Sequence, residues 1–214
     1  MICFIRIQAQ EKPEKLWDSI LANKDNLEKE LGNKGKMLYL SKRYDYNAAS
    51  LFVHVADTNL LGDFIVNQLV RLEGVTGICV INMMRPIFFP LPEETHEMKR
   101  FAITVAAFVP RLAEIYDKIS KLNYPQGILI TYLAYTCHTY GDCLQFSLLA
   151  KTETELKNFI SMVIDKIPGI LRTTVCELEK NHPFITHEVW QKYASRSPFL
   201  ENGDERDMIA QFWK

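Results

Sequence analysis

One short segment, residues 136–142, carries the densest group of side chains that could bind a ligand. Its sequence is Thr-Cys-His-Thr-Tyr-Gly-Asp. Hydroxyl, imidazole and carboxylate groups this close together could hold a small polar molecule. The same residue types also favour a plain, solvent-exposed hairpin turn. We therefore name His138, Tyr140, Gly141 and Asp142 as the candidate ligand-binding residues, with the plain turn as the alternative.

Elsewhere the sequence offers no catalytic motif. It contains no glycine-rich phosphate loop, no HExxH and no GxSxG. Asp45 and Asp142 are single carboxylates in separate segments, so they do not predict paired acid–base work. His138 with Cys137 and Cys143 could bind a metal or an iron porphyrin, but no CxxC pair accompanies them. We assign no catalytic residue, no metal site and no cofactor.

The composition is that of a globular protein and argues against several partners. Of 214 residues, 48% are hydrophobic and 24% are charged, and the net charge is -1. This charge, without a basic cluster, disfavours direct nucleic acid binding. The five cysteines are odd in number, and four of them (Cys3, Cys79, Cys143 and Cys176) lie in apolar, strand-like runs. They indicate buried free thiols in a reducing cytoplasm. No signal peptide and no membrane contact are expected.

Two segments of the chain repeat the same pattern. Leu60–Val80 aligns without gaps with Glu155–Val175 and matches Phe64 to Phe159 and Gly74 to Gly169. Apolar residues at helical spacing fill the first part of each segment, and a strand-like run follows the glycine. In the second copy, Thr152 is a predicted N-cap, with Glu155 three residues later as in a capping box.

The neighbouring residues extend the repeat to β-α-β-β-α-β, twice. The first copy begins with the strand Ile2–Gln8 and one long helix that stops at Gly32. The other predicted strands are Met37–Lys42, Ser50–Ala56, Phe101–Phe108, Ile128–Tyr135, Cys143–Ala150 and Ile170–Leu178. The predicted fold class is α+β, with tandem ferredoxin-like units and antiparallel sheets. The two copies would pack together as in a dimeric α/β-barrel.

The predicted organisation has three parts. Residues 1–90 form the first unit, 99–184 the second, and 185–214 a C-terminal helical tail. Met84–Met98, which contains three prolines, is the predicted linker. The aromatic residues of the tail predict that it docks on this chain or on a partner.

The second copy resembles a known family. Ile164–Ile170, with the sequence Ile-Asp-Lys-Ile-Pro-Gly-Ile, and the hairpin residues Gly141-Asp142 are similar to motifs of the effector-binding domain of Lrp/AsnC-type transcriptional regulators. Arg71–Val75 and Tyr44–Tyr46 are weaker matches in the first copy. The chain departs from the family in lacking its helix-turn-helix and in placing Gly141 directly beside Asp142.

The resemblance implies a regulatory protein that senses a small effector such as an amino acid at His138, Tyr140, Gly141 and Asp142. It would have no DNA-binding part of its own, and a homo-oligomer or a regulatory protein would be its partner. The alternative is a cofactor- or haem-related enzyme on a dimeric α/β-barrel scaffold, with His138, Tyr140 and Tyr135 as candidates. A structural protein that binds partners through its tail is the third hypothesis. Fold alone does not decide among them.

Overall fold

The computed structural model describes residues 1–10, 13–43, 47–95, 97–136 and 142–196, and the account below is confined to them. Within this part the chain forms two compact units. Unit 1 comprises residues 1–82 and 179–185, and unit 2 comprises residues 83–178 and 186–196. Each unit is described by itself.

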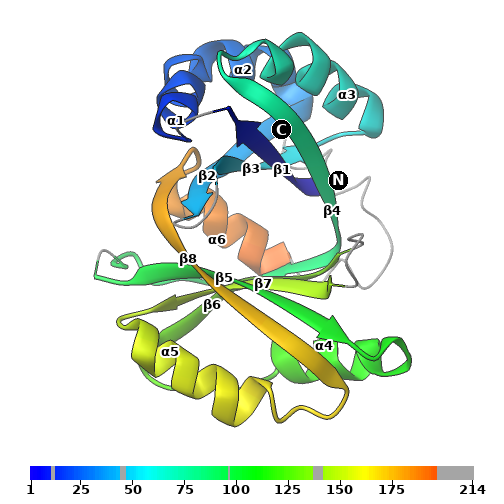
Figure 1. The fold of residues 1–214 in the computed structure, drawn as a ribbon, viewed down its shortest axis with the longest axis vertical. Coiled ribbons are helices and arrows are strands. Elements are labelled where there is room, and N and C mark those ends of the chain that lie inside the picture. Colours follow the sequence, from blue (N-terminus) through cyan, green and yellow to red (C-terminus); the bar gives the residue numbers. More distant parts are fainter. Residues whose placement is uncertain (11–12, 44–46, 96, 137–141, 197–214) are drawn as a thin grey trace. The chain divides into compact units, whose positions relative to one another are not determined.

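Unit 1 is a sheet with helices on one face (Figure 1). Its elements are β1 (Ile2–Ala9), α1 (Pro13–Ala22), α2 (Lys24–Leu31), β2 (Gly35–Arg43), β3 (Ala48–Val55), α3 (Thr58–Asn67) and the first part of β4 (Val75–Phe88). β3 pairs antiparallel with both β1 and β2. The helices bury an apolar cluster against the sheet that includes Leu16, Ile20, Leu51 and Phe64.

The long helix predicted for unit 1 is two helices. α1 ends at Ala22 and α2 begins at Lys24, so the axis breaks at Asn23. The Asn23 side chain donates a hydrogen bond to the Ser19 carbonyl at 2.8 Å, which satisfies a carbonyl at the end of α1. α2 stops at Gly32, whose φ of 55° is left-handed, as the sequence predicts.

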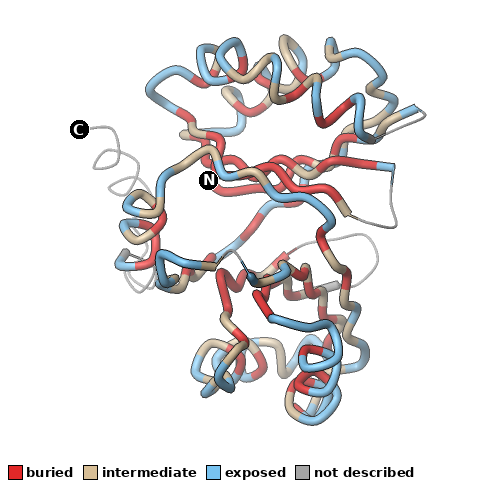
Figure 2. The backbone as a smooth tube through the Cα atoms, turned by 90° about the vertical axis from the view of Figure 1, so that its left-hand side faces the viewer, coloured by how far each residue is buried: buried red, intermediate tan, exposed pale blue. Residues whose placement is uncertain are grey.

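Unit 2 has the predicted order β-α-β-β-α-β. Its elements are β5 (Lys99–Ala107), α4 (Leu112–Ser120), β6 (Ile128–Thr136), β7 (Asp142–Ala150), α5 (Glu153–Phe159), β8 (Ile170–Pro183) and α6 (His187–Arg196). β5 pairs antiparallel with β7 and β8, and β6 pairs with β7 and with the second part of β4. Figure 2 shows buried residues along the strands of each unit and exposed residues on the outer helix faces.

The N-cap predicted for α5 at Thr152 is present. The Thr152 hydroxyl accepts a hydrogen bond from the Glu155 backbone N–H at 3.2 Å. α5 continues as a π-helical turn over Ile160–Ile164. Gly169 then takes a φ of 100° and the chain enters β8.

The predicted linker is only partly a linker. β4 continues to Phe88, so Met84–Phe88 is strand, paired with β6 around a bulge. The prolines misled the prediction, because a strand tolerates proline at a bulge. The tail begins with α6, whose Trp190 and Tyr193 rings contact Phe88 in unit 2. The rest of the tail lies outside the described residues.

The eight strands follow the hydrogen-bonded order β1-β3-β2-β8-β5-β7-β6-β4, which closes as a barrel. The fold is therefore α+β, as predicted. None of the described helices is long and apolar enough to cross a membrane. Cys3 and Cys176 are buried thiols as expected, but Cys143 is only half-buried and Cys79, on β4, is exposed.

Candidate functional site

The four ligand-binding residues named from the sequence are not tested by the structure. His138, Tyr140 and Gly141 lie outside the described residues. Asp142 opens β7, but its side chain also lies outside them. These residues stay a prediction. Tyr135, which the sequence named for the enzyme alternative, is described and lies near the end of β6.

Tyr135 belongs to a group of three residues in unit 2, which we call the tyrosine cluster: Arg85, Tyr116 and Tyr135. The rings of Tyr116, on α4, and Tyr135 stack with centroids 4.2 Å apart and planes 11° apart. The Tyr116 hydroxyl donates a hydrogen bond to the Arg85 carbonyl. Both tyrosines are half-buried and Arg85 is exposed, so the cluster is accessible to solvent.

Arg85 has an unusual backbone. It sits in the bulge of β4 between Met84 and Ile87, where the pairing with β6 shifts register. Its φ of 49° is the only left-handed value among the non-glycine residues described. Such conformations cost about 1–3 kcal/mol and persist where surrounding contacts enforce them. The bond from Tyr116 is one such contact.

The electrostatics of the cluster favour a protonated phenol at Tyr135. Burial raises the pKa of Tyr135, the charge of Arg85 lowers it and that of Asp117 raises it, and the net direction is upward. Within the described residues the Tyr135 hydroxyl has no hydrogen-bond partner. A neutral phenol with a free hydroxyl beside a guanidinium can donate a hydrogen bond to a substrate oxygen and stabilise negative charge on it.

Unit 1 buries ionisable groups instead. Lys42 faces the helices with only 4% of its side chain exposed, and its ammonium contacts Glu14 on α1 and, at 2.9 Å, Glu179 on β8. Burial by itself lowers the pKa of Lys42, but the bonds to the two carboxylates raise it by more, so the net direction is upward. A lysine held in this way stabilises the fold and is not available to a substrate.

His54 is the second buried ionisable group of unit 1. It lies on β3 with 2% exposure. Burial, the N-terminal amine and Lys36 lower its pKa to about 3. His54 therefore stays neutral at neutral pH.

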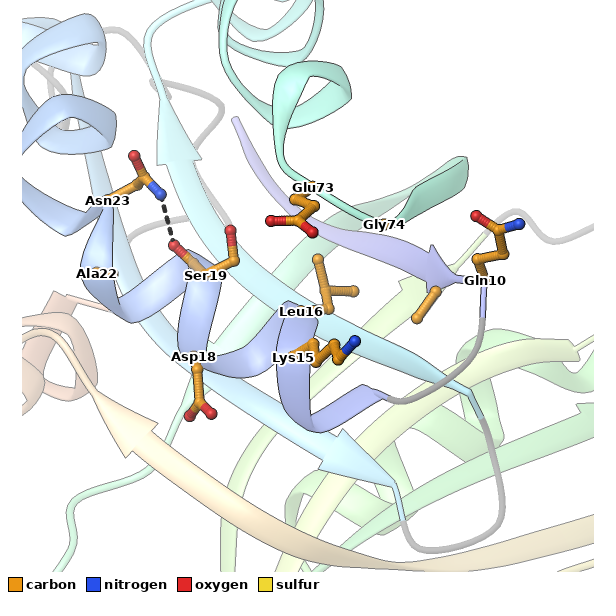
Figure 3. Close-up of a pocket in the computed structure, with 10 residues that line it drawn as sticks. Gln10, Lys15, Leu16, Asp18, Ser19, Ala22, Asn23, Glu73 and Gly74 are labelled. Atoms are coloured by element: carbon orange, nitrogen blue, oxygen red, sulfur yellow. Dashed lines mark hydrogen bonds between the residues drawn. The ribbon is translucent and has the colours of Figure 1, made fainter.

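Unit 1 also contains a cavity of about 710 Å³ between α1 and the turn that leads into β4 (Figure 3). The buried Leu16 lines it together with Lys15, Ser19 and Asn23 from the same helical region. Gln10, at the end of β1, and the turn residues Glu73 and Gly74 also line it. No local sequence signal predicts this cavity, because its walls come from separate segments of the chain.

The other histidines have local roles. His187 opens α6, and its ring contacts the Gln191 amide at 2.9 Å. His182 lies on β8 and packs edge-on against Phe184. His96 is outside the described residues. Among the residues that are described, no three His, Cys, Asp or Glu side chains gather as a metal site.

Comparisons with known proteins find the fold but no sequence relative. No family model and no curated protein matches the chain. Among solved structures, a "putative monooxygenase" from Lactobacillus acidophilus aligns with TM-score 0.54 and 8% identity over 85% of this chain and 95% of its own. A chlorite dismutase from Candidatus Nitrospira defluvii aligns with TM-score 0.55 and 12% identity over 90% and 94%. An anthrone oxidase-like protein aligns with TM-score 0.50 and 8% identity over 85% and 92%.

These structures overturn the Lrp/AsnC interpretation. The chain shares its fold with monooxygenase-like and chlorite dismutase-like proteins, so the expected regulatory family, amino-acid sensing and role in transcription are wrong. The motif at Ile164–Ile170 misled the prediction because its role is structural. Pro168 and Gly169 end a helix and turn the chain into β8, which any unit of this topology requires.

The haem-related form of the enzyme alternative can be tested against the described residues. Axial haem ligands in proteins are His, Cys, Met or Tyr beside a cavity. Between the helices and the sheet of unit 2 lies a packed apolar cluster that includes Ile103, Ile115 and Phe146. The cavity of unit 1 is lined by none of the four ligand types. The described residues do not fit a haem site.

Proposed function

We propose that the chain is an oxidoreductase of the monooxygenase type whose reaction takes place at the tyrosine cluster of unit 2. The Tyr135 hydroxyl carries the proposal, because it has no hydrogen-bond partner within the described residues and it feels the charge of Arg85. The names of two structural neighbours, a "putative monooxygenase" and an anthrone oxidase-like protein, supply the reaction class.

The proposed substrate is a planar aromatic ketone with an acidic CH₂ group, for which anthrone is the test compound. The two stacked, half-buried rings offer a flat surface on which such a molecule can stack. Tyr135 donates a hydrogen bond to the substrate carbonyl. Arg85 stabilises the enolate that forms when a CH₂ proton leaves to water.

The overall reaction consumes dioxygen and no other oxidant or reductant. The CH₂ group becomes C=O, one oxygen atom enters the product, and the other leaves as water with the two substrate hydrogens. The substrate itself supplies the electrons. The role of the described residues is limited to binding, orientation and stabilisation of charge.

Tyr116 is proposed as a positioning residue. Its hydroxyl holds the Arg85 carbonyl and its ring supports the Tyr135 ring. Without that bond the left-handed Arg85 backbone would relax and its charge would move away from Tyr135. We expect Tyr116→Phe to lower kcat more than it raises KM.

The finer fold assignment is also a proposal: two ferredoxin-like βαββαβ units arose by duplication. The support is a shared bond at the repeated glycine. The Gln10 N–H donates to the Gly74 carbonyl at 3.0 Å in unit 1, and the Phe108 N–H donates to the Gly169 carbonyl at 2.7 Å in unit 2. Both bonds join the end of the first strand to the turn before the last strand.

An oxygen electrode with anthrone tests the proposed activity. We expect oxygen uptake above the rate without enzyme and an anthraquinone product. Tyr135→Phe and Arg85→Gln should each lower kcat/KM by about 10- to 1,000-fold. Arg71→Gln, which removes an exposed arginine of unit 1, is the matched control and should retain full activity. No uptake by the wild type, or equal activity of all variants, overturns the proposal.

A further inference from the structure

The turns that lead into the last strands of the two units have similar backbones, but their surroundings differ. Gly74 and Gly169 both have left-handed φ values, 81° and 100°. In unit 2, a Cβ placed on Gly169 would meet Arg111 and Ile115 at 3.2 Å, so side chains of that unit fill the space. In unit 1, a Cβ on Gly74 would meet nothing within 4 Å. The cavity of unit 1 opens at this place.

Four of the polar and charged side chains that line the cavity are not used by the protein itself. Lys15 and Glu73 have no ion-pair or hydrogen-bond partner within the part of the chain that the structure describes, and neither do the side chains of Gln10 and Asp18. All four side chains are exposed, so a ligand in the cavity can bind them in exchange for water. The volume of about 710 Å³ falls within the usual range for small-molecule sites.

Figure 3 shows the side chains that line the cavity. The Glu73 side chain comes from the turn that leads into β4, and the Asp18 carboxylate points away from the other side chains. Lys15, Leu16 and Ser19 come from α1, and Gln10 directly follows β1. The lining therefore offers a carboxylate and a hydroxyl, together with an ammonium and an amide that donate hydrogen bonds, around the apolar Leu16.

We propose that this cavity of unit 1 binds a small hydroxylated amine, such as an amino alcohol or an amino sugar. The ligand ammonium bonds to Glu73, and charge-assisted bonds of this kind are the strong ones. The ligand hydroxyl or ring oxygens accept bonds from Lys15 and Gln10. Carbon atoms of the ligand lie against Leu16. A ligand anion near Glu73 would be repelled, and a second cation near Lys15 would be repelled as well.

The matched probes are glucosamine, glucose, which lacks the charge, and cyclohexylamine, which lacks the hydroxyls. Titration of the full chain, followed by backbone amide NMR shifts, reports both affinity and place. We expect glucosamine to shift the amide signals of Ser19, Asn23 and Gly74. Glucose and cyclohexylamine should each bind at least about tenfold more weakly, the equivalent of ~1.4 kcal/mol.

Three variants locate the binding. Glu73→Gln keeps the size of the side chain and should weaken glucosamine binding at least fivefold. Glu97→Gln removes an exposed carboxylate far along the chain and should change nothing. Ser19→Leu fills the cavity from α1. It should abolish glucosamine binding and leave the free energy of unfolding unchanged.

Three outcomes overturn the proposal: no shift at these amides with glucosamine, equal binding of glucose, or unchanged affinity of Glu73→Gln. Oxygen uptake with anthrone is measured on the same variants. Because the tyrosine cluster lies in unit 2, loss of glucosamine binding with full uptake means that the two sites are separate. The two proposals can therefore fail independently.

Discussion

Lys42 in unit 1 and Tyr135 in unit 2 hold corresponding places on their sheets and do opposite things. Lys42 pairs with Ala49 on β3, and Tyr135 pairs with Leu144 on β7. Both side chains face the helices of their unit. Lys42 is closed off by two carboxylates. Tyr135 stacks on one ring, and its hydroxyl bonds to none of the residues that the structure describes.

A second pair of positions shows the same contrast. Ile2 pairs with His54 in unit 1, and Arg100 pairs with Leu149 in unit 2. Unit 1 buries a titratable side chain where unit 2 buries leucine. Lys42 and His54 of unit 1 are thus buried inside the fold, where they set stability, whereas Tyr135 of unit 2 is half-buried. Corresponding positions of one topology are therefore closed in one unit and accessible in the other.

The largest expected effect concerns His54 of unit 1, whose place in unit 2 is taken by Leu149. The pKa of His54 falls from 6.5 to about 3 on folding, so stability is complete above pH 6.5 and is lost as the pH falls toward 3. Between pH 6.5 and pH 4 the loss from this residue is roughly 3 kcal/mol. His54→Leu, which places the residue of unit 2 in unit 1, should remove that loss.

Urea unfolding of wild type and His54→Leu at pH 7 and pH 4 measures this loss of stability. His182→Gln is the control, since His182 is a half-buried histidine on β8. Equal losses of stability in wild type and His54→Leu would show that His54 is not buried neutral.

The next largest effect concerns the ion cluster formed by Lys42, Glu14 and Glu179. Lys42→Ala leaves Glu14 and Glu179 without their common cation and removes a buried carbon stem. We expect the free energy of unfolding to fall by about 2–3 kcal/mol, below the full cost of a buried pair because both carboxylates can turn to solvent. Lys42→Met keeps the stem and should lose less. Chemical denaturation checks the order, and Lys24→Met, in an exposed pair, should be nearly neutral.

The same cluster predicts a pH dependence with a definite sign. The bond from Lys42 lowers the pKa of Glu14, so the contribution of Glu14 is present above the ordinary glutamate pKa and is lost as the pH falls through the lower value. The raised pKa of Lys42 means that its contribution is lost only as the pH rises through that higher value. In Lys42→Met, the plot of unfolding temperature against pH should therefore be flatter at its acidic end and at its basic end. A profile identical to wild type would contradict the cluster.

The smallest effect sharpens the chemistry of Tyr135. Because the charge of Arg85 opposes the effect of burial, Arg85→Gln should raise the pKa of Tyr135 further. Absorbance titration of phenolate, with Tyr135→Phe to assign the signal, measures the direction. Arg71→Gln should leave it unchanged. A downward shift in Arg85→Gln would mean that Arg85 does not act on this hydroxyl.

Local signals predicted much of the scaffold and little of the site. The cap at Thr152 and the helix stop at Gly32 depend on residues within a few positions, so the sequence alone defines them. Tyr135 entered the enzyme alternative by residue type, but Tyr116 and Arg85 were missed. Pro86 was the available signal for Arg85, because proline in a strand marks a bulge.

The sequence by itself determined the α+β class, the order of strands and helices in unit 2 and the repeated glycine turns. These follow from periodicity, capping and turn chemistry, which act over a few residues. Only the tertiary structure decided that Lys42 is buried between Glu14 and Glu179, that Tyr116 stacks on Tyr135, and that the Gly74 turn stays open. Those contacts join residues far apart in the chain. Their energies depend on burial and distance, which no short stretch of sequence contains.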